Sequence, residues 1–150
     1  MSWSLFLERT KTNTEPYGDE KDENVIPFTK SEILACISDM PETMNISIED
    51  TENHIMYGKS HIIYVYSQEW SINMWFWERC LYSENSYYVV ELEIKAASEP
   101  KEFLSLLAEK LRARLFDMHA GTFWTVDGTG FSDWKSHCNK IIKAVFGENG

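Results

Sequence analysis

The stretch Tyr87-Tyr-Val-Val-Glu-Leu-Glu-Ile-Lys95 decides the fold class, because its side chains alternate between apolar and charged. Positions 88, 90, 92 and 94 are apolar and share one side of an extended chain, whereas Glu91, Glu93 and Lys95 share the other. This alternation predicts a β-strand with one face in a core and one face toward water.

Further strands are predicted upstream of this one. Residues 44, 46 and 48 alternate with polar residues, and the polar cluster 49–53 is typical of the turn after such a strand. Residues 55–57 are a short strand candidate, and 58–60 are its turn. Residues 61–66 are rich in β-branched and aromatic side chains, and positions 72, 74 and 76 face inward from the next strand. Short polar turns between consecutive strands predict an antiparallel meander.

The first helix is predicted from its capping residues. Thr29 and Glu32 have the spacing of a capping box, in which the hydroxyl accepts from one amide and the carboxylate from another. Pro41 prevents the helix from continuing, so it spans about 30–39.

Two more helices are predicted where the spacing of apolar residues changes from two to three or four. After Glu99-Pro100, leucines and a methionine recur at intervals of three and four through residue 118, which predicts one long helix that ends at Gly121. A strand is predicted at 122–126. The last helix is expected at about 132–146, with residues 134, 138, 141, 142 and 145 on its buried face.

The predicted elements follow the order α-β-β-β-β-β-α-(β)-α. Because the strands are grouped rather than alternating with helices, we expect a single α+β domain over 1–150, with about five antiparallel strands and the helices packed on one face. Residues 10–24 are polar and acidic, and we expect them to form a mobile acidic loop.

The charge of the chain is unevenly distributed. Residues 1–53 carry 12 of the 24 acidic residues against four basic ones, net −8, whereas the whole chain has net charge −10. A field of this sign attracts a basic protein and repels nucleic acid. We therefore expect a basic protein partner and no nucleic acid.

The termini and cysteines suggest a cytoplasmic protein. The first residues lack the basic start of a secretion signal, and no stretch approaches the ~20 apolar residues that a membrane helix needs, so we expect no membrane contact. Cys36, Cys80 and Cys138 are odd in number and widely spaced, as expected of reduced thiols.

Motifs for catalysis are weak throughout. The histidines lack metal-ligand spacing, and the two glycines of residues 127–130 fit neither a dinucleotide nor a phosphate-loop motif. Glu91 and Glu93 have a spacing that could serve acid–base chemistry, but alternate charges are also typical of any half-exposed strand. We therefore predict no catalytic residue, no metal and no cofactor.

Candidate partner-binding residues are of two kinds. Trp75 and Trp77 should point away from the core if residues 74 and 76 point into it, and they face either a second helix layer or a partner. The others are carboxylates at expected loops and turns: Asp19, Glu20, Asp22, Glu23, Asp39, Glu42, Glu49, Asp50 and Glu52.

The segment 122–133 resembles the Val-Asp-Gly-x-Gly-Phe-type segment near the C-terminus of some immunity proteins of bacterial polymorphic toxin and contact-dependent growth inhibition systems. The residues that match are Val126, Asp127, Gly128, Gly130 and Phe131. The resemblance implies a cytoplasmic protein that binds one cognate toxin domain and blocks its active site. It implies neither which toxin nor which contact residues.

The function expected from these observations is that of a non-catalytic inhibitor whose carboxylates complement a toxin domain, with a nuclease as the candidate partner. Two alternatives stay open. One is a small enzyme in which Cys80 or Cys138 meets His61 or His119 in space, and the other is a subunit that buries Trp75 and Trp77 against another copy. The oligomeric state is not predicted.

Overall fold

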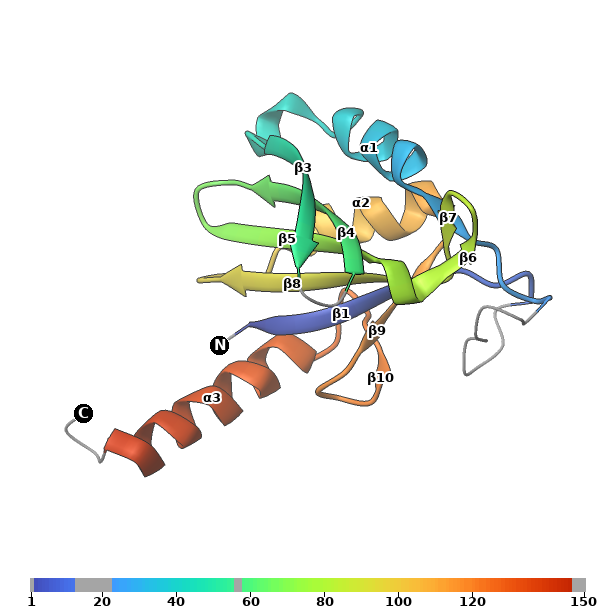
Figure 1. Cartoon of the computed structure of the whole chain (residues 1–150). Helices are drawn as coiled ribbons and strands as arrows, with labels where there is room; N and C mark the ends of the chain where they lie inside the picture. Colours follow the sequence, from blue (N-terminus) through green and yellow to red (C-terminus); the bar gives the residue numbers. More distant parts are fainter. Residues whose placement is uncertain (1, 13–22, 56–57, 147–150) are drawn as a thin grey trace.

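The computed structural model describes residues 2–12, 23–55 and 58–146 (Figure 1). The architecture is α+β: within these ranges a seven-stranded sheet and a small three-stranded sheet accompany three α-helices. In chain order the elements are β1 (Trp3–Glu8), β2 (Phe28–Thr29), α1 (Lys30–Ser38), η1 (Glu42–Met44), β3 (Ser47–Ile55), β4 (Gly58–Tyr66), β5 (Trp70–Trp77), η2 (Glu78–Cys80), β6 (Leu81–Ser83), β7 (Ser86–Tyr87), β8 (Val90–Ala96), α2 (Lys101–Leu111), β9 (Arg114–Asp117), β10 (Thr122–Phe123) and α3 (Gly130–Phe146).

The large sheet has the order β10-β9-β1-β8-β5-β4-β3, and neighbouring strands are antiparallel. The part β3-β4-β5-β8 is the predicted meander, interrupted in the chain by β6 and β7, which join β2 in the small sheet. The prediction of about five strands was wrong, because β1, β9 and β10 extend the sheet beyond β8.

Strand β1 was not predicted, and yet it lies between β8 and β9. Its residue Leu5 lies opposite Leu92 on one side and opposite Asp117 on the other. Trp3, Leu5 and Leu7 are fully buried and alternate with Ser4 and Phe6. The pattern is that of a strand, but its pairing with residues about a hundred positions later is invisible to local analysis.

The predicted long helix over 100–118 is instead the helix α2 followed by the strand β9. The helix ends at Leu111, because Arg112 adopts a left-handed conformation with φ 52° and its N–H bonds to the carbonyls of Ala108 and Glu109. Leu115 continues the helical spacing from Leu111 but also fits the two-residue period of a strand that pairs with β1. The sheet contact therefore overrides the helical period.

Strand β3 also differs from the expectation. The predicted strand at 44–48 begins only at residue 47, since Met44 belongs to η1, and the predicted turns at 49–53 and 58–60 lie within β3 and β4. The two strands pair from Ser47 opposite Tyr66 to Ile55 opposite Gly58. At the edge of a sheet, polar and charged side chains are tolerated, so a strand can resemble a turn in its composition.

Helix α1 begins as predicted. The Thr29 hydroxyl oxygen accepts a hydrogen bond from the Glu32 N–H at 3.1 Å. The Glu32 carboxylate does not complete the capping box but accepts from the Arg9 guanidinium at 2.9 Å. Ile33, Cys36 and Ile37 are buried.

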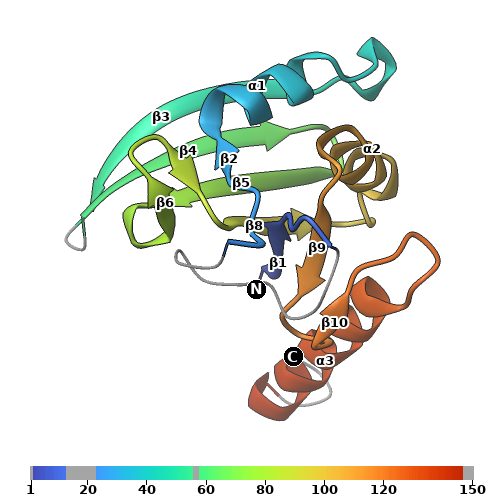
Figure 2. The ribbon, with the colours of Figure 1, turned by 90° about the vertical axis from the view of Figure 1, so that its right-hand side faces the viewer.

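Helices α1 and α2 pack on the same side of the large sheet (Figures 1 and 2), which we call the covered face. One continuous core joins the inward residues of α1 and α2 to alternate residues of β1, β4, β5 and β8. At its edge, the rings of Trp70 and Phe103 meet with centroids 5.0 Å apart. The predicted inward positions 72, 74 and 76 are all fully buried, as are 90, 92 and 94.

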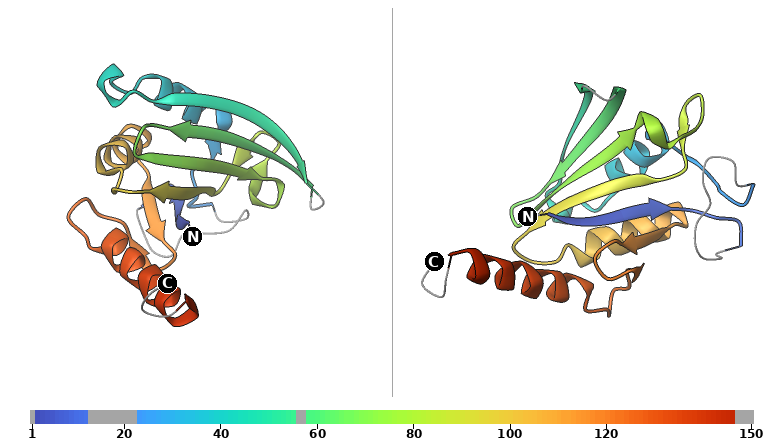
Figure 3. Two further views of the ribbon diagram at one scale, coloured as in Figure 1. Left: turned by 90° about the vertical axis from the view of Figure 1, so that its left-hand side faces the viewer. Right: turned by 60° about the horizontal axis from the view of Figure 1, so that its bottom comes forward.

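Helix α3 contacts the rest of the described chain through its N-terminal turns. Phe131 packs edge-on against Trp3 with centroids 5.3 Å apart, and Lys135 donates to the Ala97 carbonyl. The helix then runs beyond the sheet (Figure 3), and the predicted buried face is wrong there: Ile141, Ile142 and Val145 are exposed, Val145 by 68 %. Among the described helices, none is both long and apolar enough to cross a membrane.

Most of the acidic loop predicted over 10–24 lies outside the described residues, which omit 13–22. Its two ends are held together, since Thr10 and Val25 form an antiparallel bridge and the Lys11 N–H donates to the Asn24 carbonyl at 2.8 Å.

Candidate functional site

The face of the large sheet opposite α1 and α2, here called the open face, has no described helix packed on it; α3 begins against Trp3, whose side chain lies on the covered face. The strand registers place alternate residues of neighbouring strands side by side on the open face. Its side chains include Glu49, Ile62, Tyr64, Tyr66, Asn73, Trp75, Trp77, Glu91, Glu93, Lys95, Phe6, Glu8, Arg114 and Phe116.

The centre of the open face is a stacked pair of tryptophans. The rings of Trp75 and Trp77 lie parallel within 2°, with centroids 4.4 Å apart. The Arg79 guanidinium lies 5.0 Å from the Trp77 ring centroid, and Trp77 Nε1 donates to Glu91 Oε1 at 3.1 Å. The strand register places both tryptophans on the face opposite to Met74 and Phe76, as predicted, and Trp77 also packs against the edge of the core. No second helix layer faces them in the described chain, so a partner site is the alternative that stays open.

Carboxylates border this pair on β8. Glu91 lies opposite Trp75, and Glu93 lies opposite Asn73, whose Nδ2 donates to Glu93 Oε1 at 3.1 Å. Both glutamates are half-buried, and Lys95 follows them as an exposed cation. Carboxylates held by neutral donors beside an aromatic platform suit the recognition of a cation.

The other end of the open face is closed by a buried ion pair. The Arg114 guanidinium donates to Glu8 Oε1 at 3.0 Å, and Glu8 is fully buried. The same guanidinium lies 4.1 Å from the ring centroid of Phe123. Since these charges neutralise one another, they add little to the field of the surface.

Those predicted acidic residues whose side chains are described do not form one platform. Glu49 lies on the open face opposite Tyr64, whereas Asp50 points to the covered face and pairs with Lys30 at 3.1 Å. Asp39 pairs with Lys110 of α2 at 3.0 Å, and this carboxylate raises the pKa of the Lys110 ammonium.

For the remaining predicted carboxylates the structure shows no ion pair among the described residues. Glu23, near the end of the acidic loop predicted over 10–24, is exposed. Glu42, the first residue of η1, is also exposed. Glu52 belongs to β3, but its side chain is outside the described part of the chain, as are Asp19, Glu20 and Asp22 altogether.

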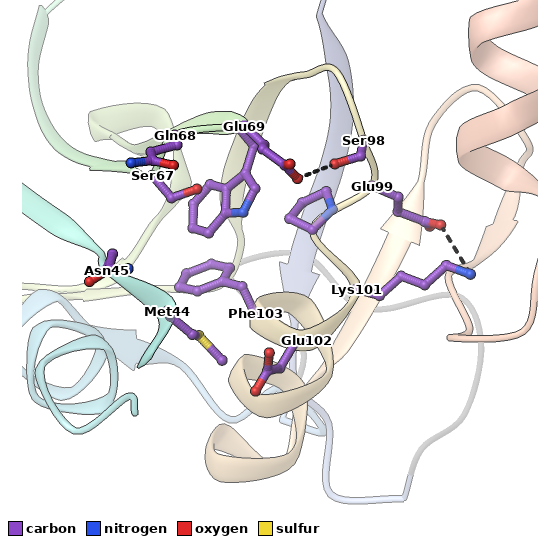
Figure 4. Close-up of a pocket in the computed structure, with 12 residues that line it drawn as sticks. Met44, Asn45, Ser67, Gln68, Glu69, Ser98, Glu99, Lys101, Glu102 and Phe103 are labelled. Atoms are coloured by element: carbon purple, nitrogen blue, oxygen red, sulfur yellow. Dashed lines mark hydrogen bonds and ion pairs between the residues drawn. The ribbon is translucent and has the colours of Figure 1, made fainter. Parts of the chain in front are cut away.

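A pocket of about 290 Å³ lies where η1, the start of β5 and the start of α2 meet (Figure 4). Ser98 Oγ donates to Glu69 Oε2 at 2.7 Å, and the Lys101 ammonium lies 3.8 Å from Glu99 Oε2. Glu102 lines the same pocket. The sequence did not predict this pocket, because its lining comes from three segments that only the fold brings together: 44–45, 67–70 and 98–103.

Residues 122–133 comprise β10, the turn that follows it and the first residues of α3. A Cβ placed on Gly130 would lie 2.4 Å from Asp117 Oδ2, so only glycine fits there without a shift. Asp117 is buried, and its Oδ1 accepts from the N–H groups of His119 and Ala120. The geometry therefore gives Gly130 a packing role at the start of α3.

Among the described residues, neither Cys80 nor Cys138 forms a hydrogen bond with His61 or His119. Cys36 and Cys80 are buried, and burial is the main cause that raises the pKa of each thiol, which favours the neutral form over a nucleophilic thiolate. Cys138 is half-buried on α3. The rings of His119 and His137 meet at 5.0 Å between centroids.

Within the described ranges, no group of three or more His, Cys, Asp or Glu side chains could hold a metal ion. The comparisons with known proteins give no further guide, since no family model, no curated protein and no solved structure matches the chain.

Proposed function

We propose that this chain is a non-catalytic binding protein whose open face receives a basic protein, and that the partner is a cytoplasm-acting bacterial toxin domain, such as a nuclease, that the chain neutralises. The observation that carries the proposal is the open face, where a stacked tryptophan pair lies among carboxylates and no described helix covers it. Large aromatic rings beside charges that complement the partner are the usual anchors of protein interfaces.

The charge of the open face supports a basic partner. Glu49, Glu91 and Glu93 outnumber the two cations Lys95 and Arg79 there, while Glu8 and Arg114 compensate each other. The whole chain adds a net charge of −10, which attracts a cationic protein over a distance. The resemblance of residues 122–133 to immunity proteins supplies the class of partner, and the open face supplies the surface.

The test begins with the reading frames that neighbour this chain's coding sequence, because the proposal expects one of them to encode a toxin domain. Co-expression of the two proteins should restore the growth that the domain alone abolishes, and the purified proteins should form a complex by calorimetry. The double variant Glu91→Gln/Glu93→Gln should weaken that complex. Glutamine keeps a carbonyl acceptor for Trp77 Nε1 and Asn73 Nδ2, so only the charge is lost.

Glu23→Gln/Glu42→Gln is the matched control, because it removes the same charge from exposed positions away from the tryptophan pair. Equal weakening by both double variants would assign binding to net charge rather than to the open face. Failure to restore growth, together with no complex between the purified proteins, would overturn the proposed function.

A further inference from the structure

We infer that Trp75 receives an arginine side chain of the partner, stacked on the ring face that is turned away from Trp77 and bonded to Glu91 or Glu93. The inference rests on the proposed function, because it names the partner group that the open face recognises. It follows from three features of the described residues: an incomplete stack, adjacent carboxylates with free acceptor capacity, and two completed sites of the same kind elsewhere in the chain.

The stack has one occupied end and one open end. The Trp77 ring is covered by Arg79 at 5.0 Å and by Trp75 at 4.4 Å between centroids. Since a planar ring has two faces, both faces of Trp77 are in use. On Trp75, no second ring or cation packs within the described part of the chain. A further group that extends the stack of Arg79, Trp77 and Trp75 would therefore lie on the free ring face of Trp75. It would lie above Asn73, which is the preceding residue on this face of β5.

Two carboxylates flank that position. Glu91 lies opposite Trp75, and its Oε1 accepts from Trp77 Nε1 at 3.1 Å. Glu93 lies opposite Asn73, and its Oε1 accepts from Asn73 Nδ2 at 3.1 Å. Among the described residues no hydrogen bond is seen at the second oxygen of either carboxylate, so each can accept from an incoming cation. The neutral donors hold the carboxylates in place without cancelling their charge.

The chain already builds this kind of site twice. The Arg9 guanidinium lies 4.4 Å from the Phe28 ring centroid and pairs with Glu32 at 2.9 Å. The Arg114 guanidinium lies 4.1 Å from the Phe123 ring centroid and pairs with Glu8 at 3.0 Å. In both sites one guanidinium uses an aromatic face and a carboxylate together. Trp75 with Glu91 and Glu93 supplies the ring and the carboxylates and lacks only the guanidinium.

Arginine fits this position better than lysine. The guanidinium is planar, so it can lie parallel to the indole while its edge N–H groups reach a carboxylate. A lysine ammonium is a more strongly hydrated point charge and cannot satisfy both partners with one flat group. The site should therefore distinguish two peptides of equal charge.

The experiment measures binding of N-acetylated hexa-arginine amide and hexa-lysine amide to the full chain by calorimetry at low salt. The arginine peptide should bind about fivefold or more tightly than the lysine peptide. Trp75→Leu should remove this preference, and Glu93→Gln should reduce it. Tyr66→Leu, which removes an exposed ring from the same face, should leave it intact. Thermal unfolding of each variant checks that the fold is retained.

Equal binding of the two peptides, or a preference that survives Trp75→Leu in a folded protein, overturns the arginine site. The result is independent of the toxin experiment. A complex with the toxin domain but no arginine preference would remove the inference and keep the proposed function. A preference for the arginine peptide without a toxin complex would support the arginine site at Trp75 and would contradict the proposed function.

Discussion

The covered and open faces of the large sheet are made by alternate residues of the same strands, and they differ in chemistry. On β5 the covered face presents Ile72, Met74 and Phe76, which are fully buried under α1 and α2. The open face presents Asn73, Trp75 and Trp77, of which Asn73 donates a hydrogen bond to Glu93 and Trp77 donates one to Glu91. The covered face is therefore apolar and excludes water, whereas the open face combines aromatic rings with hydrogen-bonded carboxylates.

The largest expected effect concerns Glu8, which lies on the open face and is nevertheless buried, as are Ile62 and Ser60 of the same face. Glu8→Gln removes the buried negative charge that lies 3.0 Å from the Arg114 guanidinium. We expect the free energy of unfolding to fall by about 3–5 kcal/mol in urea denaturation. The double variant Glu8→Leu/Arg114→Met should recover most of that loss. If Glu8→Gln leaves the free energy of unfolding unchanged, the ion pair does not stabilise the fold.

Neighbouring residues of β5 test the comparison directly. Met74→Ala removes a fully buried side chain from the covered face and should lower the free energy of unfolding by about 2–5 kcal/mol. Asn73→Ala, one residue away on the open face, should cost about 1 kcal/mol, because it loses one hydrogen bond. Equal losses in chemical denaturation would mean that both faces serve the core.

A smaller effect is expected at the turn before α3. Gly130→Ala places a Cβ against Asp117 Oδ2 and should cost about 1–3 kcal/mol of stability by thermal or chemical unfolding. Gly121→Ala is the matched glycine control. Gly121 has φ +72° but open space around its Cβ position, so it should cost only about 1 kcal/mol of backbone strain. The reverse order would remove the packing role of Gly130.

Trp75→Leu should have little effect on the fold. It breaks one stacked ring pair on the open face, so the free energy of unfolding should fall by about 0.5–1.5 kcal/mol. Binding of the toxin domain should weaken by a larger factor than this loss of stability explains. A variant that unfolds the protein would place Trp75 in the core instead.

The smallest effect is a difference in thiol reactivity. Burial raises the pKa of the Cys80 thiol, so at neutral pH the native protein holds it as the protonated, unreactive form. Above the ordinary thiol pKa the unfolded chain loses this proton first, and stability should therefore fall slightly as pH rises. Mass spectrometry after brief treatment with iodoacetamide at neutral pH should find Cys138 modified before Cys36 and Cys80. Rapid native labelling of Cys80 would contradict its burial.

The parts of the fold that were predictable from sequence are those that local patterns determine. Thr29 caps α1 through one local hydrogen bond, and the alternation in β5 and β8 reports which residues are buried. Strand β1 and the end of α2 were missed, because both depend on pairing between residues about a hundred positions apart. Leucine spacing at 111 and 115 fits a helix and a strand equally well.

The candidate site was predictable in part. The outward orientation of Trp75 and Trp77 followed from alternation, but their stack and its link to Glu91 follow from the register between β5 and β8, which the sequence does not state. Charge counting identified Asp39 and Asp50 as partner-binding candidates, yet both pair with lysines of the same chain. A count of charges cannot show which ones are already compensated.

The most direct test of the open face as a docking surface is the rate at which the toxin domain associates with the chain, measured by stopped-flow fluorescence at increasing salt. We predict that the rate falls steeply as salt shortens the Debye length to about 8 Å and below, and that Glu91→Gln/Glu93→Gln flattens this dependence while Glu23→Gln/Glu42→Gln largely preserves it. A rate that is independent of salt, or identical in the two double variants, would contradict docking at the open face.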